Sequence, residues 1–88
     1  MKQWPPWWVW ELELSPHLLK RMGDRGFSEV DLRRMLEHAG DHAPDIMAGR
    51  FVIEARHGGQ AWAVIVEPDE GRQLLVVVTA YPVEEAQS

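Results

Sequence analysis

The chain has 88 residues, of which 45% are hydrophobic and 26% are charged, and its formal net charge is −5. This length and composition exclude a disordered chain and predict one small domain with a single core. The chain has no cysteine, which excludes a disulfide framework and a thiolate metal site. No apolar run approaches the roughly 18 residues of a membrane-spanning helix, so we expect a cytoplasmic protein that does not bind membranes.

The first segment is rich in tryptophan and is predicted to form a strand. We expect residues 1–6 to be a flexible lead-in, because its two prolines supply no amide donors to a sheet. From Trp7 to Leu14 the apolar side chains alternate, and the set predicted to face the core is Trp8, Trp10, Leu12 and Leu14. Trp4 and Trp7 are then the exposed tryptophans. Exposed aromatic side chains are favoured anchors, so these two residues also form a candidate partner-binding patch.

Two helices with a glycine break between them are predicted next. Ser15 and Pro16 are typical of a helix start, and we expect this helix to end near Met22. Ser28 is the predicted N-cap of the second helix, where Asp31 occupies the capping-box position. At helical spacing, the core face of the second helix comprises Leu32, Met35, Leu36 and Ala39.

Residues 40–49 are predicted to form a loop, because they contain two glycines and a proline. His38 and His42 are four residues apart, a spacing that can hold a metal ion on one helix. Gly40 interrupts any such helix, and no third ligand has a matching position. We therefore expect neither a metal nor another cofactor.

The remaining chain has the period-two pattern of strands. Gly58 and Gly59 form a two-residue turn between strands over 50–57 and 60–67. If residue 57 pairs with residue 60, one face carries Phe51, Ile53, Ala55, Trp62, Val64 and Val66.

A turn over 68–71 leads into the last predicted strand, from Arg72 to Tyr81. Pairing residue 67 with residue 72 places Leu75, Val77 and Thr79 on the core face. The residues predicted to gather at one end of that face are His57, Gln60, Thr79 and Tyr81.

These elements define an α+β domain over residues 7–83, with flexible ends over 1–6 and 84–88. The predicted order is β-α-α-β-β-β, with two helices packed on one face of a mainly antiparallel four-stranded sheet. The last strand is apolar on both sides, so we expect the first strand to pair with it.

A basic stripe edges the first helix. At 100° per residue, His17, Arg21 and Arg25 fall at about 0°, 40° and 80°. Residues 15–36 carry five basic and three acidic side chains, a local net charge of +2. This grouping is the main functional lead, because it places an imidazole and two guanidinium groups together.

The run from His17 to Val30 resembles the signature H-x-x-x-R-M-x-x-R-G-(aliphatic)-S-x-x-(aliphatic) of a bacterial family of small domains of unknown function. A strand after Gly49-Arg50 and a closing V-V-V-T-x-Y strand, here Val76 to Tyr81, extend the resemblance over residues 14–83. The family is similar in element order to RelE/ParE-like toxins, which include metal-independent ribonucleases.

The resemblance implies an RNA-cleaving protein of a toxin-antitoxin or related system, with RNA and a cognate antitoxin as partners. Its motif positions are His17, Arg21, Arg25, Thr79 and Tyr81. RNA cleavage without a metal needs a base, an acid and cations beside the phosphorane.

Within that hypothesis His17 moves a proton, and Thr79 or Tyr81 donates a hydrogen bond in the transition state. The phosphate binders are Arg21, Arg25 and Arg50. His57 is a second proton carrier by the strand register alone.

A second hypothesis is a non-catalytic protein-binding module of the same fold, monomeric or dimeric. It binds through its sheet edge or through Trp4 and Trp7. The net charge of −5 favours this alternative, because RNA-directed proteins are generally basic.

Overall fold

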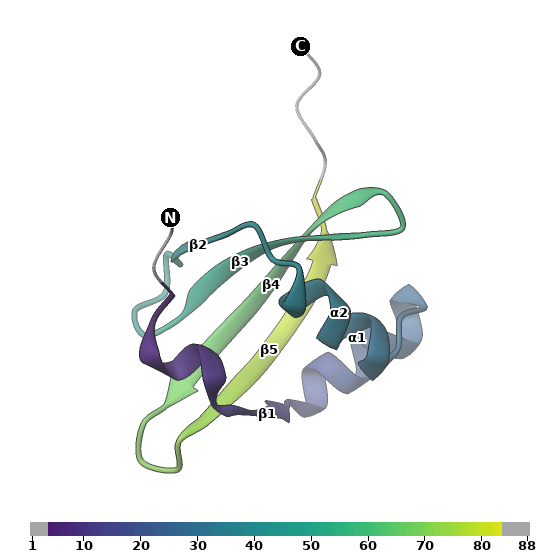
Figure 1. The fold of residues 1–88 in the computed structure, drawn as a ribbon. Coiled ribbons are helices and arrows are strands. Elements are labelled where there is room, and N and C mark those ends of the chain that lie inside the picture. Colours follow the sequence, from purple (N-terminus) through teal and green to yellow (C-terminus); the bar gives the residue numbers. More distant parts are fainter. Residues whose placement is uncertain (1–3, 84–88) are drawn as a thin grey trace.

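The structure, a computed structural model, describes residues 4–83, so the predictions for residues 1–3 and 84–88 lie outside the described residues. Within this range the strands form one mixed sheet in the order β1-β5-β4-β3-β2 (Figure 1). The elements in chain order are η1 (Pro6–Val9), β1 (Glu11–Leu14), α1 (Pro16–Arg25), α2 (Glu29–Glu37), β2 (Asp41–Pro44), β3 (Phe51–His57), β4 (Gln60–Asp69) and β5 (Leu74–Pro82).

The α+β class is confirmed, and both helices pack on the same face of the sheet. The fully buried core joins Leu18 of α1 and Leu32 of α2 to Val64 and Val77 on the two central strands. The predicted core face of α2 is correct, since Leu32, Met35 and Leu36 are buried and Ala39 packs against them.

The sheet has five strands in the described range, so the predicted four-stranded sheet is wrong. The extra strand is β2, which occupies part of the predicted loop and pairs antiparallel with β3. Gly40 N–H continues this contact by donating to the Glu54 carbonyl at 2.9 Å. With only four residues and no alternation of polarity, β2 carries too weak a pattern for its sequence to reveal it.

The predicted strand over 7–14 is also corrected. Its first part is the 3-10 helix η1, which begins at a proline and is closed by the Trp8 N–H donating to the Pro5 carbonyl. Proline at a first helical position has the backbone angle that such a turn needs. Only β1 is extended, and it pairs with β5 as predicted, although in parallel orientation.

Local capping signals fix both helix boundaries. The side chain of Ser15 accepts a hydrogen bond from Leu18 N–H, and α1 continues to Arg25, three residues beyond the predicted end. Gly26 then closes α1 at φ 68°, a left-handed conformation that glycine adopts readily. The predicted capping box of α2 is confirmed, because Ser28 and Asp31 exchange hydrogen bonds in both directions.

The hairpin of β3 and β4 has the predicted register. His57 pairs with Gln60, Ala55 with Trp62 and Phe51 with Val66. Gly58 and Gly59 both have positive φ, which is the conformation that a primed two-residue turn requires.

The predicted register of β4 with β5 is wrong. The turn has the predicted four residues but lies two residues later in the chain, over 70–73, so Asp69 rather than Glu67 is the last paired residue before it. A bulge at Val78 then separates the pair Val66–Val77 from the pair Ile65–Thr79. An extra residue in one strand exchanges the faces of all later residues. Leu75 and Val77 therefore face the core as predicted, whereas Thr79 faces away from it and Ala80 is buried in its place.

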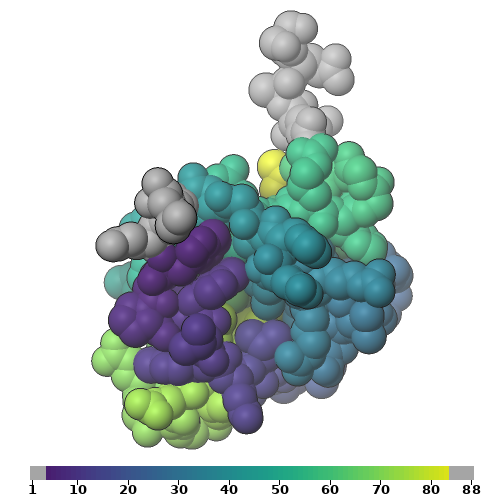
Figure 2. Space-filling model, in the orientation of Figure 1, coloured from purple at the N-terminus to yellow at the C-terminus, as the bar shows by residue number. Residues whose placement is uncertain are grey.

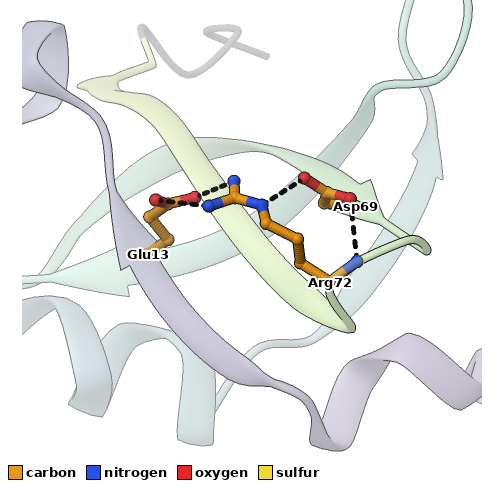
Figure 3. A network of polar contacts seen from close by, with 3 residues as sticks. All are labelled: Glu13, Asp69 and Arg72. Atoms are coloured by element: carbon orange, nitrogen blue, oxygen red, sulfur yellow. Dashed lines mark hydrogen bonds and ion pairs between the residues drawn. The ribbon is translucent and has the colours of Figure 1, made fainter.

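A polar network joins β1 to the turn between β4 and β5 (Figure 3). The Arg72 guanidinium donates to Glu13 of β1 at 2.5 Å and to the Asp69 side chain at 2.8 Å. These contacts lie on the side of the sheet opposite the helices, since Glu13 pairs with Val76 rather than with a core position. Arg72 lowers the pKa of the Asp69 carboxyl through these hydrogen bonds.

Candidate functional site

The first helix lies against the edge of the last strand. Since β1 ends opposite Val77, the later part of β5 has no strand neighbour on this side within the described chain. Ser15 instead donates its side-chain hydroxyl to the Val78 carbonyl at 2.7 Å. Ten residues further along, Arg25 Nη1 donates to the Ala80 carbonyl at 2.6 Å. Both ends of α1 are thereby fixed to β5.

The basic stripe of α1 follows this edge. His17 is exposed in the first turn, and its side chain has no hydrogen bond or ion pair within the described residues. Arg21 forms a surface ion pair with Asp24 at 3.3 Å. Arg25 reaches the backbone between Thr79 and Tyr81. The structure thus brings the helical motif against the strand motif, through one arginine.

The side chains of Thr79 and Tyr81 lie on the other face of β5. They pair with Ile65 and Ala63, whereas the intervening Ala80 is fully buried among the core residues. The predicted cluster of His57, Gln60, Thr79 and Tyr81 is therefore wrong, because the bulge exchanges the two faces. A site that uses all the motif positions must lie across the edge of β5, with α1 on one side and Tyr81 on the other.

Two predicted site residues lie elsewhere. His57 stands on the helix side of the sheet, with its ring edge-on to Trp62 at a centroid distance of 5.5 Å. The buried Trp62 Nε1 has no hydrogen-bond partner within the described residues. Arg50 pairs with Glu67 at 3.0 Å on the helix-free face. Neither residue contacts the stripe of α1 through an interaction found in the structure.

The N-terminal tryptophans pack inward. Trp7 is only 8% exposed and tilts against Phe51 at 5.0 Å, so its predicted exposure is wrong. Trp4 is half-buried, stacks on Trp8 at 4.3 Å and lies 4.7 Å from the His42 ring. The turn of η1 causes this arrangement, since it removes the alternation that a strand would impose. These contacts bury Trp7 and leave Trp4 partly exposed, so a role of Trp4 as a partner anchor stays a prediction.

Two hollows mark the surface of the described residues. One of about 230 Å³ lies between η1 and α2, where Figure 2 shows part of β5 at its floor. Its walls include Trp8, Trp10 and Leu36. A larger hollow of about 770 Å³ includes Ala63 and Tyr81, which belong to the helix-free face. This second hollow was not predicted from the sequence, because in the sequence its residues form only the outward sides of separate strands.

Neither a membrane-spanning helix nor a cluster of metal ligands is found among the described residues. None of the helices there combines the length and apolar character needed to cross a membrane. Over residues 4–83, no three His, Cys, Asp or Glu side chains gather in an arrangement that would hold a metal ion.

Comparison with known families matches residues 14–82 to a family described as "Domain of unknown function (DUF4258)". The match covers most of the chain and includes α1, α2 and the strands that they contact. The protein belongs to this family of small uncharacterised domains. Neither a curated protein nor a solved structure matches the chain.

Proposed function

We propose that this domain is a toxin-like ribonuclease that cleaves RNA without a metal ion. The observation that supports the proposal most is the 2.6 Å contact between Arg25 Nη1 and the Ala80 carbonyl. This contact sets the His17–Arg25 stripe beside the strand that carries Thr79 and Tyr81. RNA is then the substrate class, and a cognate antitoxin is the expected protein partner.

The arginines of the stripe remain available for a phosphate. Arg21 and Asp24 are both partly exposed, and surface ion pairs of this kind contribute about 0–1 kcal/mol. A phosphate can therefore replace Asp24 at little cost. Arg25 uses one of its five N–H donors on the Ala80 carbonyl, which leaves donors for a second acceptor. The local net charge of +2 over residues 15–36 favours the same ligand.

The proposed chemistry is a proton transfer beside a phosphate held by two guanidinium groups. His17 acts as general base or general acid, a role that imidazole serves more often than any other side chain. It takes the 2′-hydroxyl proton as the 2′-oxygen bonds to phosphorus, or it protonates the 5′-oxygen as the bond from phosphorus to that oxygen breaks, and solvent water makes the other proton transfer. Arg21 and Arg25 stabilise the charge of the phosphorane. Tyr81 is half-exposed across the strand edge and donates a hydrogen bond from that side. Arg50 and His57 take no part, because their contacts hold them at other surfaces.

Expression in bacteria tests this function. Wild-type protein should arrest growth and fragment cellular RNA, whereas the double variant His17→Ala/Arg21→Ala should do neither. Arg33→Ala is the matched control, since Arg33 is also an exposed helical arginine in a surface ion pair, with Glu29 at 3.0 Å. The control should behave as wild type. Normal growth with soluble wild-type protein, or arrest by the double variant, would contradict the proposal.

A further inference from the structure

The sheet has one face that the helices leave bare. Both helices and Trp7 pack against the core side, so the opposite side of the strands carries no helix of the described chain. We name this side the open face and define it by the residues that share it with Ala63 in the strand pairing. Its central residues are Ala43, Val52, Glu54, Ala61, Ala63, Ile65, Thr79 and Tyr81.

The open face is hollowed. Ala63 and Ile65 are only 5% and 6% exposed, although neither belongs to the main core. Their neighbours on this face shield them, because a twisted sheet brings adjacent side chains over its centre. The hollow of about 770 Å³ is lined by both apolar and polar side chains, among them Ala43, Val52, Glu54, Ala61, Ala63 and Tyr81. This surface offers an apolar floor with a polar rim.

The charge of the open face is negative. By strand pairing and by their ion pairs, six carboxylates and three guanidinium groups share this side, a net charge of −3. They are Glu11, Glu13, Asp41, Glu54, Glu67, Asp69, Arg50, Arg56 and Arg72. Phosphates are repelled by such a surface, whereas lysine and arginine side chains are attracted.

A partner could instead add a strand to an edge of the sheet, but prolines at the edges oppose this mode of binding. Pro44 lies in the edge strand β2, and Pro82 ends β5 beyond the last residue that pairs with β1. Proline cannot donate to a new strand, and it is a common means of blocking an edge. A partner is therefore expected to lie across the face rather than along an edge.

We propose that the open face binds an amphipathic, basic helix of another protein, with its apolar side on Ala61 and Ala63 and its cations beside Glu54. Helices recognised in this way place apolar residues in a groove and charged residues at its rim. This site shares Tyr81 with the proposed RNA site, but Glu54, Ala61 and Ala63 take no part in RNA cleavage, so this binding goes beyond the proposed function and does not depend on it.

Amide chemical shifts of labelled protein test the proposal. The probe is a synthetic peptide of about 18 residues with a leucine face and a lysine face in helical register, and its counterpart carries glutamate in place of lysine. We expect the lysine peptide to shift amides of β3, β4 and Tyr81, with weaker binding as salt is added. The glutamate peptide should leave them unchanged.

A charge reversal locates the binding. Glu54→Lys should weaken binding of the lysine peptide by about threefold to tenfold, because it replaces an attractive rim charge by a repulsive one. Glu37→Lys is the matched control on an exposed carboxylate of α2 and should leave affinity unchanged. Retained amide spectra establish that both variants fold. Shifts confined to the helix side, equal binding of both peptides, or an RNA oligonucleotide that shifts the amides of β3 would overturn the inference.

Discussion

Single polar side chains fix the boundaries on which the candidate site depends. Arg25 links the end of α1 to β5, and Ser15 links its start to the same strand. Ser28 and Asp31 fix where α2 begins, with three residues between the end of α1 and the start of α2. The direction of the basic stripe therefore depends on a few hydrogen bonds at helix termini, where backbone groups otherwise lack partners.

Asp31 gives the helix start a pH dependence. The Ser28 N–H lowers the pKa of the Asp31 carboxyl from its ordinary value of 3.8, and the Ser28 hydroxyl lowers it further. A carboxyl with a lowered pKa in the folded state contributes stability above its unfolded pKa and loses it as the pH falls through the folded value. Asp31→Asn should therefore reduce the loss of stability below about pH 4.

Urea unfolding at several pH values measures this effect, and Ser28→Ala provides the control background. Ser28→Ala removes the hydroxyl donor but keeps the backbone N–H of residue 28, which is the larger cause, so in this background Asp31→Asn should still change the loss of stability in acid, by a smaller amount. If the free energy of unfolding fell equally with decreasing pH in Asp31→Asn and in wild type, the assigned cause would be contradicted.

At the scale of elements, α1 holds its position by one buried leucine. Leu18 is 0% exposed and faces the sheet, whereas the adjacent Leu19 is 53% exposed. Leu18→Ala should lower the free energy of unfolding by about 2–5 kcal/mol, because it leaves a cavity in a packed core. Leu19→Ala should change it by less than about 0.5 kcal/mol. Equal losses in urea unfolding would mean that α1 does not pack as described.

Strong local signals made part of this fold predictable. Two glycines in a two-residue turn determine the register of β3 with β4, because only a few turn geometries join two strands so closely. The Ser28 capping box likewise gives the start of α2. The core faces of the β3–β4 hairpin and of α2 follow from their periodicity once the boundaries of these elements are known.

The remaining fold depends on tertiary contacts that leave little local pattern. The bulge at Val78 lies in a run of apolar residues, where an extra residue changes neither composition nor hydrophobicity. Parallel pairing of β1 is decided by packing across the molecule, and β2 is recruited by the edge of β3.

The candidate site was predictable only in part for the same reason. Helical spacing correctly groups His17, Arg21 and Arg25, since it needs no tertiary information. Predicting which face carries Thr79 and Tyr81 requires the register of β5 with β4, and the bulge changes this register. The open face combines side chains from several strands, so no stretch of sequence contains its pattern.

Considered as a whole, the molecule distributes its charge unevenly between the helical segment and the open face. The helical segment over residues 15–36 has a net charge of +2, and the open face has a net charge of −3. A total charge of −5 therefore does not describe the surface that RNA would meet. Apart from Tyr81, which both proposals use, different residues would bind a nucleic-acid substrate and a basic protein partner.

The direct test of RNA cleavage uses purified protein, a single-stranded RNA and a metal chelator. Wild type should cleave the RNA with the chelator present, and Arg33→Ala should do so at a similar rate. His17→Ala should lower the rate about 100-fold or more, as loss of a proton-transfer group does. Intact RNA with folded wild type, or cleavage by His17→Ala at the wild-type rate, would contradict a ribonuclease site on α1.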